Sequence, residues 1–88
     1  MRFQFTRRFE QSFKKAHKRG KDIGKLEHIM DCIIQGQPLP PRCRDHLLEG
    51  NFKGVRECHV EPDWLLLYFQ DADRIVFVDT GTHADLFR

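Results

Sequence analysis

The chain has 88 residues, of which 40% are hydrophobic and 32% are charged, and its formal net charge is +2. This length predicts one domain over residues 1–88, and the composition excludes an intrinsically disordered protein. Three cysteines without a Cys-x-x-Cys pair exclude a disulfide framework and favour a reducing compartment. We find no stretch that could cross a membrane and no signal-peptide core at the N-terminus, so we expect a cytoplasmic protein.

The charge is unevenly distributed along the chain. Residues 1–44 contain eleven Lys and Arg against four Asp and Glu, a net +7, whereas residues 45–88 contain four against nine, a net −5. Lys and Arg displace counterions from phosphate, so the basic half indicates contact with a polyanion. A solvated helix face is the simpler interpretation of the same pattern, and composition alone favours it.

The first half predicts a strand followed by two helices. Residues 2–6 alternate between apolar and polar, as in a half-buried strand, and Thr6 can cap a helix that runs from Arg7 to about residues 19–20. A second helix is expected from residue 21 or 22 to Gln35, where Gly36 ends it. Its apolar face and the many Lys and Arg elsewhere predict a basic helical hairpin with one apolar side.

The second half predicts three strands after a proline-rich loop over residues 36–45. Strand-like runs occupy residues 55–61, 64–70 and 74–80, with short polar breaks between them, and residues 83–87 predict a last helical turn. The fold class is therefore α+β, in the order β-α-α-β-β-β. We expect a curved antiparallel sheet with the first strand at its edge and the helical hairpin on one face.

Three polar side chains are expected to meet at one end of this sheet. In a meander the first and third strands run in the same direction, so His59 and His83 lie at the same end, with Asp63 in the turn between them. His46 precedes this sheet by only a loop. The sequence thus predicts a cluster of three imidazoles and one carboxylate.

Three interpretations of this cluster compete. His with Asp is a chemically reasonable metal site, but the sequence has no His-Glu-x-x-His motif and no paired Cys/His ligands. Each His taken alone is more often a surface residue than a catalyst. Together they suit metal-free acid/base cleavage of RNA, in which the ribose 2′-OH loses a proton and the 5′-oxygen gains one.

Substrate-binding side chains are sought around the same cluster. Lys53, Arg56 and Arg74 are candidates for neutralising phosphate. Trp64 and Phe87 are candidates for stacking on bases, with Phe87 the better one because it follows His83 by four residues near an end of the chain. For Tyr68 we favour core packing.

Four sequence blocks resemble the YafQ-like mRNA interferase toxins of bacterial type II toxin–antitoxin systems, which belong to the RelE/ParE superfamily. The resemblance covers the whole chain, and the helical half matches more loosely. The blocks are Asp45-His46-x-Leu48-x-Gly50, Lys53-Gly54-x-Arg56, His59-Val60-Glu61-Pro62-Asp63-Trp64 and Thr80-Gly81-Thr82-His83-Ala84-x-Leu86-Phe87.

The resemblance implies a RelE-like fold and a ribosome-dependent endoribonuclease that cuts translated mRNA in the A site without metal or cofactor. The catalytic positions carry over to His46, His59, Asp63 and His83. His83 would be the general acid, His59 with Asp63 the base or phosphate stabiliser, and His46 would complete the pocket. The C-terminal aromatic carries over to Phe87.

The resemblance also implies partners. They are a DinJ-like antitoxin, in a hetero-oligomer expected to be a heterotetramer built on an antitoxin dimer, and the 70S ribosome with its mRNA. Operator DNA would be bound only through the antitoxin. A ParE-like toxin that poisons a protein such as gyrase is the main rival, because it shares the fold without needing the histidines. A plain nucleic-acid-binding module and a metal-dependent nuclease are weaker rivals.

Overall fold

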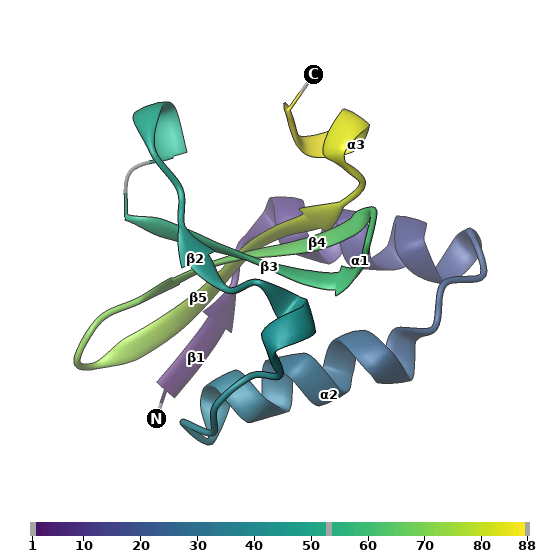
Figure 1. Cartoon of the computed structure of the whole chain (residues 1–88). Coiled ribbons are helices and arrows are strands. Elements are labelled where there is room, and N and C mark those ends of the chain that lie inside the picture. Colours follow the sequence, from purple (N-terminus) through teal and green to yellow (C-terminus); the bar gives the residue numbers. More distant parts are fainter. Residues whose placement is uncertain (1, 53, 88) are drawn as a thin grey trace.

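The structure, a computed structural model, describes residues 2–52 and 54–87. An edge strand and two helices come first, followed by a short strand, a three-strand meander and a last helix (Figure 1). Two single-turn 3₁₀ helices flank the short strand. In chain order the elements are β1 (Arg2–Phe5), α1 (Arg7–Lys18), α2 (Ile23–Ile34), η1 (Pro41–Cys43), β2 (His46–Leu47), η2 (Gly50–Phe52), β3 (Val55–Glu61), β4 (Trp64–Gln70), β5 (Arg74–Gly81) and α3 (His83–Phe87).

The five strands form one twisted sheet in the order β1-β5-β4-β3-β2. The predicted α+β architecture, the meander and the edge position of β1 are confirmed. Two details differ from the prediction. The sheet is mixed, because β1 pairs parallel to β5, and the two-residue strand β2 extends the opposite edge by pairing with β3. The helical hairpin explains the parallel pairing, since it returns the chain to the end of the sheet at which β1 began.

Both long helices begin and end where the sequence predicted. The Thr6 hydroxyl accepts a hydrogen bond from the backbone N–H of Phe9, and the Asp22 carboxylate accepts one from that of Lys25. These caps satisfy backbone donors that the first turn leaves unpaired. The chain leaves α2 through Gly36, at φ +71°, a left-handed conformation that glycine adopts without steric cost.

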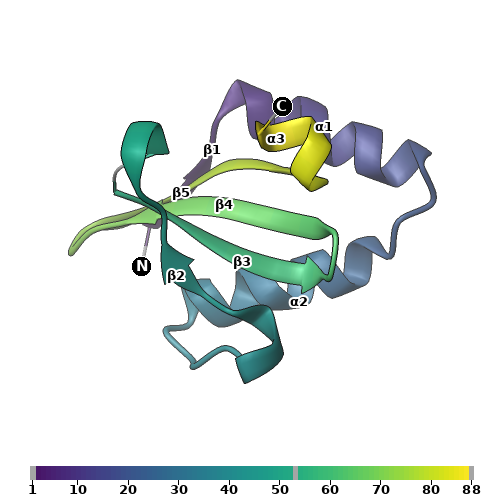
Figure 2. The same cartoon turned by 45° about the horizontal axis from the view of Figure 1, so that its top comes forward.

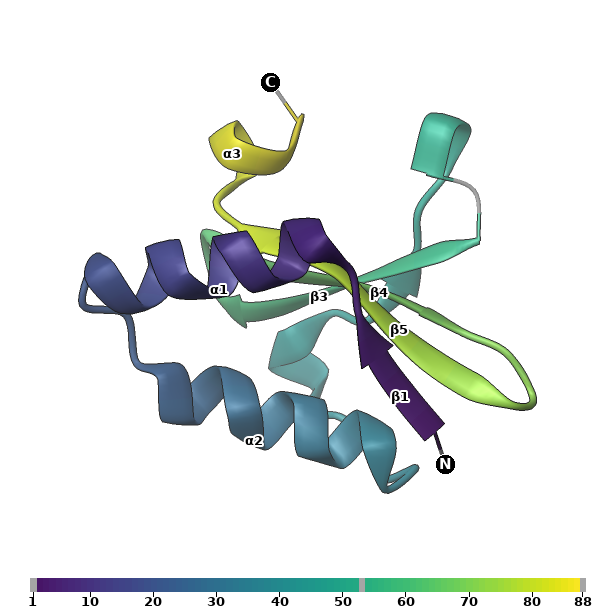
Figure 3. The ribbon, with the colours of Figure 1, turned by 180° about the vertical axis from the view of Figure 1, so that it is seen from behind.

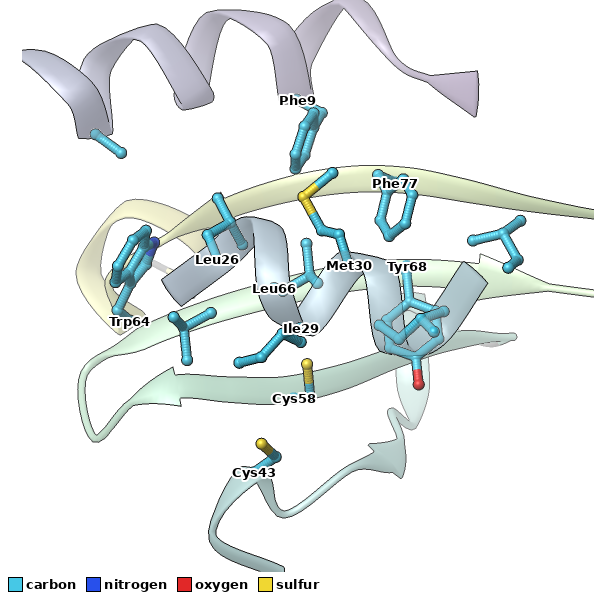
Figure 4. Packing of buried hydrophobic residues seen from close by; sticks show 14 residues of the cluster. Phe9, Leu26, Ile29, Met30, Cys43, Cys58, Trp64, Leu66, Tyr68 and Phe77 are labelled. Carbon is cyan, nitrogen blue, oxygen red and sulfur yellow. The ribbon is translucent and has the colours of Figure 1, made fainter. Parts of the chain in front are cut away.

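The helices α1 and α2 supply one hydrophobic core with one face of the sheet (Figures 3 and 4). Phe9 of α1 lies 5.9 Å from Phe77 of β5, ring centre to ring centre, and Leu26 and Met30 of α2 are buried. Across the ranges 2–52 and 54–87, no helix reaches the length and apolarity that a membrane span requires. The α3 helix and η2 project from the side of the sheet opposite α2 (Figure 1).

The predicted core role of Tyr68 is confirmed. Its side chain is 2% exposed, and its hydroxyl donates a hydrogen bond of 2.7 Å to Asp45 Oδ1. Burial, followed by the bond to Asp45, raises the pKa of this hydroxyl well above its usual range. Tyr68 is therefore a neutral donor that fixes the carboxylate next to His46.

Candidate active site

Side chains of β3 alternate between the core and the free face of the sheet. Cys58 and Val60 point into the core, so Glu57 and His59 lie on the free face. The short strand β2 pairs His46 with Glu57 in register, which places His46 on that same face. A histidine, a glutamate and a second histidine are thus adjacent across two strands.

Glu57 is the centre of this group. Its carboxylate Oε1 lies 3.4 Å from His59 Nε2 and 3.8 Å from His46 Nε2. The Glu57 side chain is only 9% exposed, whereas that of His46 is 51% exposed. Sequence reasoning missed Glu57, although the spacing Glu57-x-His59 on one strand was the signal that both share a face.

The second half of the site is a tight pair between the β3–β4 turn and α3. Asp63 Oδ1 lies 2.6 Å from His83 Nδ1 and also accepts a hydrogen bond of 2.9 Å from the His83 backbone N–H. The hydrogen bond from the His83 backbone, and then the one from its ring, hold the pKa of Asp63 below its usual value. With Nδ1 occupied, Nε2 of His83 is the nitrogen left for a substrate.

The two halves meet at the rings of His59 and His83, whose centres are 5.9 Å apart. The predicted convergence of His46, His59, Asp63 and His83 is therefore observed. The predicted pairing of Asp63 with His59 is wrong, since Asp63 contacts His83. A register shift between His59 and Glu61 ends the regular ladder just before the turn that carries Asp63, while His59 turns to Glu57.

Aromatic side chains lie along one flank of the site. Phe87 is 38% exposed, and its ring centre is 6.4 Å from that of His83 and 5.3 Å from that of Phe52, which the sequence did not single out. Trp64 does not fit the stacking role predicted for it. It is 1% exposed, and its indole N–H donates to Thr80 Oγ1 within the core, so neither face is open to a base.

Two of the cations predicted to neutralise phosphate, Arg56 and Arg74, lie away from the cluster. Lys53 falls outside the described residues. Arg56 does not join the cluster: strand alternation places it on the face opposite His59, where its Nε and Nη2 each donate to the Asp45 carboxylate at 3.2 Å. Arg74 begins β5 and pairs with Asp71, at the other end of that strand from His83.

The α3 helix begins with a reciprocal capping box, and one member of that box ties the helix to α1. Thr82 Oγ1 accepts from the Asp85 backbone N–H at 3.1 Å, and Asp85 Oδ2 accepts from the Thr82 backbone N–H at 3.0 Å. Asp85 also binds Arg19 of the α1 C-cap at 2.9 Å. The pattern Thr82-x-x-Asp85 was the sequence signal for the capping box, and it was missed.

The same side chains include a potential metal-ligand set. Ligand atoms of Glu57, His59 and His83 lie within 4.8 Å of one another. Two imidazoles and a carboxylate suit a borderline transition-metal ion, with further positions open to water. The same cluster could therefore serve acid/base cleavage or metal-dependent cleavage. A chelator distinguishes the two, because only the second needs a bound metal ion.

The two carboxylates that hold α3 predict acid sensitivity. Asp85 has its pKa lowered from 3.8, first by the hydrogen bond from Arg19 and then by that from the Thr82 backbone, and the pKa of Asp63 is lowered by His83. A lowered folded-state pKa stabilises the fold above pH 3.8, and this contribution is lost as pH falls through the folded-state value. We expect the free energy of unfolding, measured in urea, to decrease from pH 7 to pH 3. The free energy of unfolding of Asp85→Asn should decrease less over the same pH range. Equal decreases in the variant and in wild type would contradict the role assigned to Asp85.

Known proteins share this fold and sequence. A family model described as a bacterial toxin of type II toxin–antitoxin systems, YafQ, matches residues 1–88. The chain is 42% identical over 85 residues to the mRNA interferase toxin YafQ of Escherichia coli strain K12, covering 96% of this chain and 92% of that relative. It superposes on the crystal structure of YafQ from E. coli strain BL21(DE3) with a TM-score of 0.96 at 40% identity over 100% of both chains. It matches YafQ in the E. coli DinJ–YafQ complex with a TM-score of 0.92 at 41% identity, over 98% of this chain and 96% of that one.

Fold and family model together place the chain among the bacterial toxins of type II toxin–antitoxin systems. Within that class it belongs to the YafQ family. The resemblance that the sequence blocks indicated is thereby confirmed.

Proposed function

We propose that this toxin is an endoribonuclease that cuts translated mRNA in the ribosomal A site by metal-free acid/base chemistry. The observation that carries the proposal is the pairing of two carboxylate–imidazole units across 5.9 Å, with Asp63–His83 on one side and Glu57–His59 on the other. The E. coli relative's name, mRNA interferase toxin, supports the same activity.

The reaction needs one group that accepts a proton and one that donates it. The ribose O2′ loses its proton and bonds to the adjacent phosphorus as the bond from phosphorus to O5′ breaks, and O5′ leaves with a proton. The products are a 2′,3′-cyclic phosphate and a 5′-OH. DNA lacks the 2′-OH nucleophile, so it would not be cut.

His83 is assigned the general acid. Its ring is 52% exposed, and Asp63 holds Nδ1, so a proton on Nε2 faces solvent and an incoming 5′-oxygen. Phe87, next to this ring, offers a face on which a neighbouring base stacks.

The coupled group His46–Glu57–His59 is assigned the base and the phosphate stabiliser. His59 Nδ1 lies 3.3 Å from the carbonyl oxygen of Pro62 and its Nε2 faces Glu57, so both ring nitrogens have acceptors. That arrangement fixes the His59 ring beside the Glu57 carboxylate, at the position proposed for the scissile phosphate. In such a cluster the proton belongs to the group rather than to one residue.

Partners follow from the relatives and from charge. The E. coli YafQ was crystallised with its antitoxin DinJ, and we propose a DinJ-like antitoxin for this toxin. An acidic segment that folds on binding complements the basic N-terminal half of the chain, which carries a net +7 over residues 1–44. The same basic surface is proposed to contact ribosomal RNA when antitoxin is absent.

The proposal is tested by inducing the toxin in a bacterial host and mapping the 5′ ends of one message. A translated copy and a matched copy without a ribosome-binding site are compared in the same cells. We expect new 5′ ends on the translated copy only, together with growth arrest. Growth arrest with both copies intact would favour the ParE-like alternative, which the converging cluster does not favour.

Chelation separates the metal-free mechanism from the metal-dependent one. Ribosome integrity needs magnesium, so the toxin is first dialysed against EDTA and then added in excess to translating ribosomes in magnesium buffer. We expect its cleavage rate to stay within about twofold of untreated toxin, because protein groups supply both proton transfers. A large loss that zinc or copper restores would assign the Glu57, His59 and His83 set to an essential metal.

A further inference from the structure

The α3 helix carries His83 and Phe87, yet none of its described residues is buried. Apart from the contact between the rings of Phe87 and Phe52, hydrophobic packing therefore contributes little to its orientation on the sheet. A five-residue helix is also too short to be stable by itself. Something else must hold the two side chains at their places in the site, and the polar contacts of residues 82–85 are the available means.

Asp85 makes most of those contacts. It closes the capping box with Thr82, and its Oδ2 accepts a hydrogen bond of 2.9 Å from Arg19 Nη1, which lies 66 residues away in the sequence at the end of α1. Arg19 Nη2 and Lys15 Nζ lie 3.5 and 3.9 Å from Oδ1. Figure 2 shows the consequence, with α3 lying next to α1.

The backbone beneath Asp85 is shaped to accept it. A Cβ added at Gly81 would lie 2.9 Å from Asp85 Cβ and 3.0 Å from Asp85 Oδ2, so the side chain packs directly on the glycine. The contact also forms part of the wall of a polar cleft of about 310 Å³ between α1, β5 and α3. Asp85 is thus enclosed by groups from three elements, although it lies outside the hydrophobic core.

We propose that Asp85 is a positioning residue for the cleavage reaction: by joining Thr82 to Arg19 it holds α3 against α1, so that His83 faces His59 and Phe87 lies beside His83. This inference rests on the proposed function. Asp85 does not touch the reacting atoms in this arrangement, since its carboxylate points toward α1 while His83 points toward Asp63.

The expected effect is local. Part-exposed ion pairs contribute little to global stability, so loss of the Arg19 contact should leave the sheet and the core intact. The orientation of a catalytic group is far more sensitive, because a displacement of about 1 Å can cost about a hundredfold in rate. A residue of this kind should change the rate of chemistry and the opening of α3 strongly, with only a small change in thermal unfolding of the whole protein.

The experiment compares Asp85→Asn, Arg19→Gln, the double variant and Gly81→Ala with wild type. Asp31→Asn on α2, an exposed aspartate, is the matched control for loss of one negative charge. Single-turnover cleavage is measured on ribosomes that carry a defined mRNA, at saturating toxin. Amide hydrogen exchange at residues 82–87 is measured on the free toxin, which gives a readout independent of activity.

We expect Asp85→Asn and Gly81→Ala each to lower the single-turnover rate on the order of tenfold and to speed exchange at residues 82–87. The double variant should lose no more than Asp85→Asn, because Arg19 acts through Asp85. Asp31→Asn should match wild type. Faster exchange in Gly81→Ala would show that displacing an intact Asp85 is sufficient.

Two results would overturn the inference. One is unchanged cleavage and exchange in Asp85→Asn, and the other is an additional loss in the double variant equal to that of Arg19→Gln alone. Failure of the proposed function has a different signature. In that case wild type leaves the message intact, or His83→Gln cuts the message as fast as wild type does. The proposed role of Asp85 in cleavage would then be wrong too, even if hydrogen exchange at α3 still changes.

Discussion

His83→Gln is expected to lower the cleavage rate by about 10²- to 10⁴-fold, the usual contribution of a general acid, and to abolish growth arrest. The glutamine amide can still donate a hydrogen bond to Asp63, but it cannot transfer a proton to the leaving 5′-oxygen. The change is therefore aimed at the chemistry and not at the fold. Single-turnover cleavage on programmed ribosomes measures it directly.

The controls for His83→Gln separate chemistry from folding and binding. Circular dichroism and antitoxin binding should equal those of wild type, because the His83 side chain is half exposed and outside the core. His28→Gln, an exposed histidine on α2, should cut at the wild-type rate. Growth arrest by both wild type and His83→Gln with no message cut would overturn the catalytic assignment and make a ParE-like poison the leading interpretation.

Glu57→Gln is expected to lower the single-turnover rate by about 10²- to 10³-fold while half-saturation by ribosomes stays close to wild type. The amide keeps the shape of the side chain but removes the charge that His59 and His46 share. With that charge gone, the group no longer accepts the 2′ proton or holds an imidazolium beside the phosphate. The rate of chemistry should therefore fall without a matching loss of affinity.

Glu27→Gln on α2 is the matched control for Glu57→Gln, because it removes one exposed carboxylate that is not part of the cluster of His46, His59 and His83. A loss confined to half-saturation, with an unchanged rate at saturation, would show that Glu57 serves binding only. Equal activity in Glu57→Gln and wild type would contradict the assignment of the base to the group that contains Glu57. His46→Gln would then have to be tested by itself.

Much of the fold was predictable because it depends on local patterns. The alternation in residues 55–61, the apolar runs over 64–70 and 74–80, and the capping residue Thr6 act within a few positions along the chain. The short breaks between strands predicted the meander, and the meander predicted that His59 and His83 lie at the same end of the sheet. The two-residue strand β2 and the parallel pairing of β1 were not predicted, because both depend on which edge of the sheet is free.

Site membership was harder to predict where side-chain direction decides the outcome. Trp64 follows Asp63 directly and has a large aromatic ring, yet strand alternation turns it into the core, where Thr80 satisfies its indole. Arg56 is turned to the helix-covered side for the same reason and is bound by Asp45. Glu57 was overlooked because a glutamate in a strand is usually a surface residue, and only its neighbours across β2 and β3 give it a role.

The sequence by itself determined the order of elements, the family and the presence of three histidines and an aspartate at one end of the sheet. The order of elements and the cluster depend on periodicity, turn residues and chain direction, which act over short distances, whereas the family was indicated by the resemblance of four sequence blocks. Only the tertiary structure decided that Asp63 serves His83, that Glu57 serves His59 and His46, and that Asp85 ties α3 to Arg19. Glu57 and His59 share β3, but the other pairings join separate strands, turns or helices, and the physical reason is that such partners are chosen by how those elements pack.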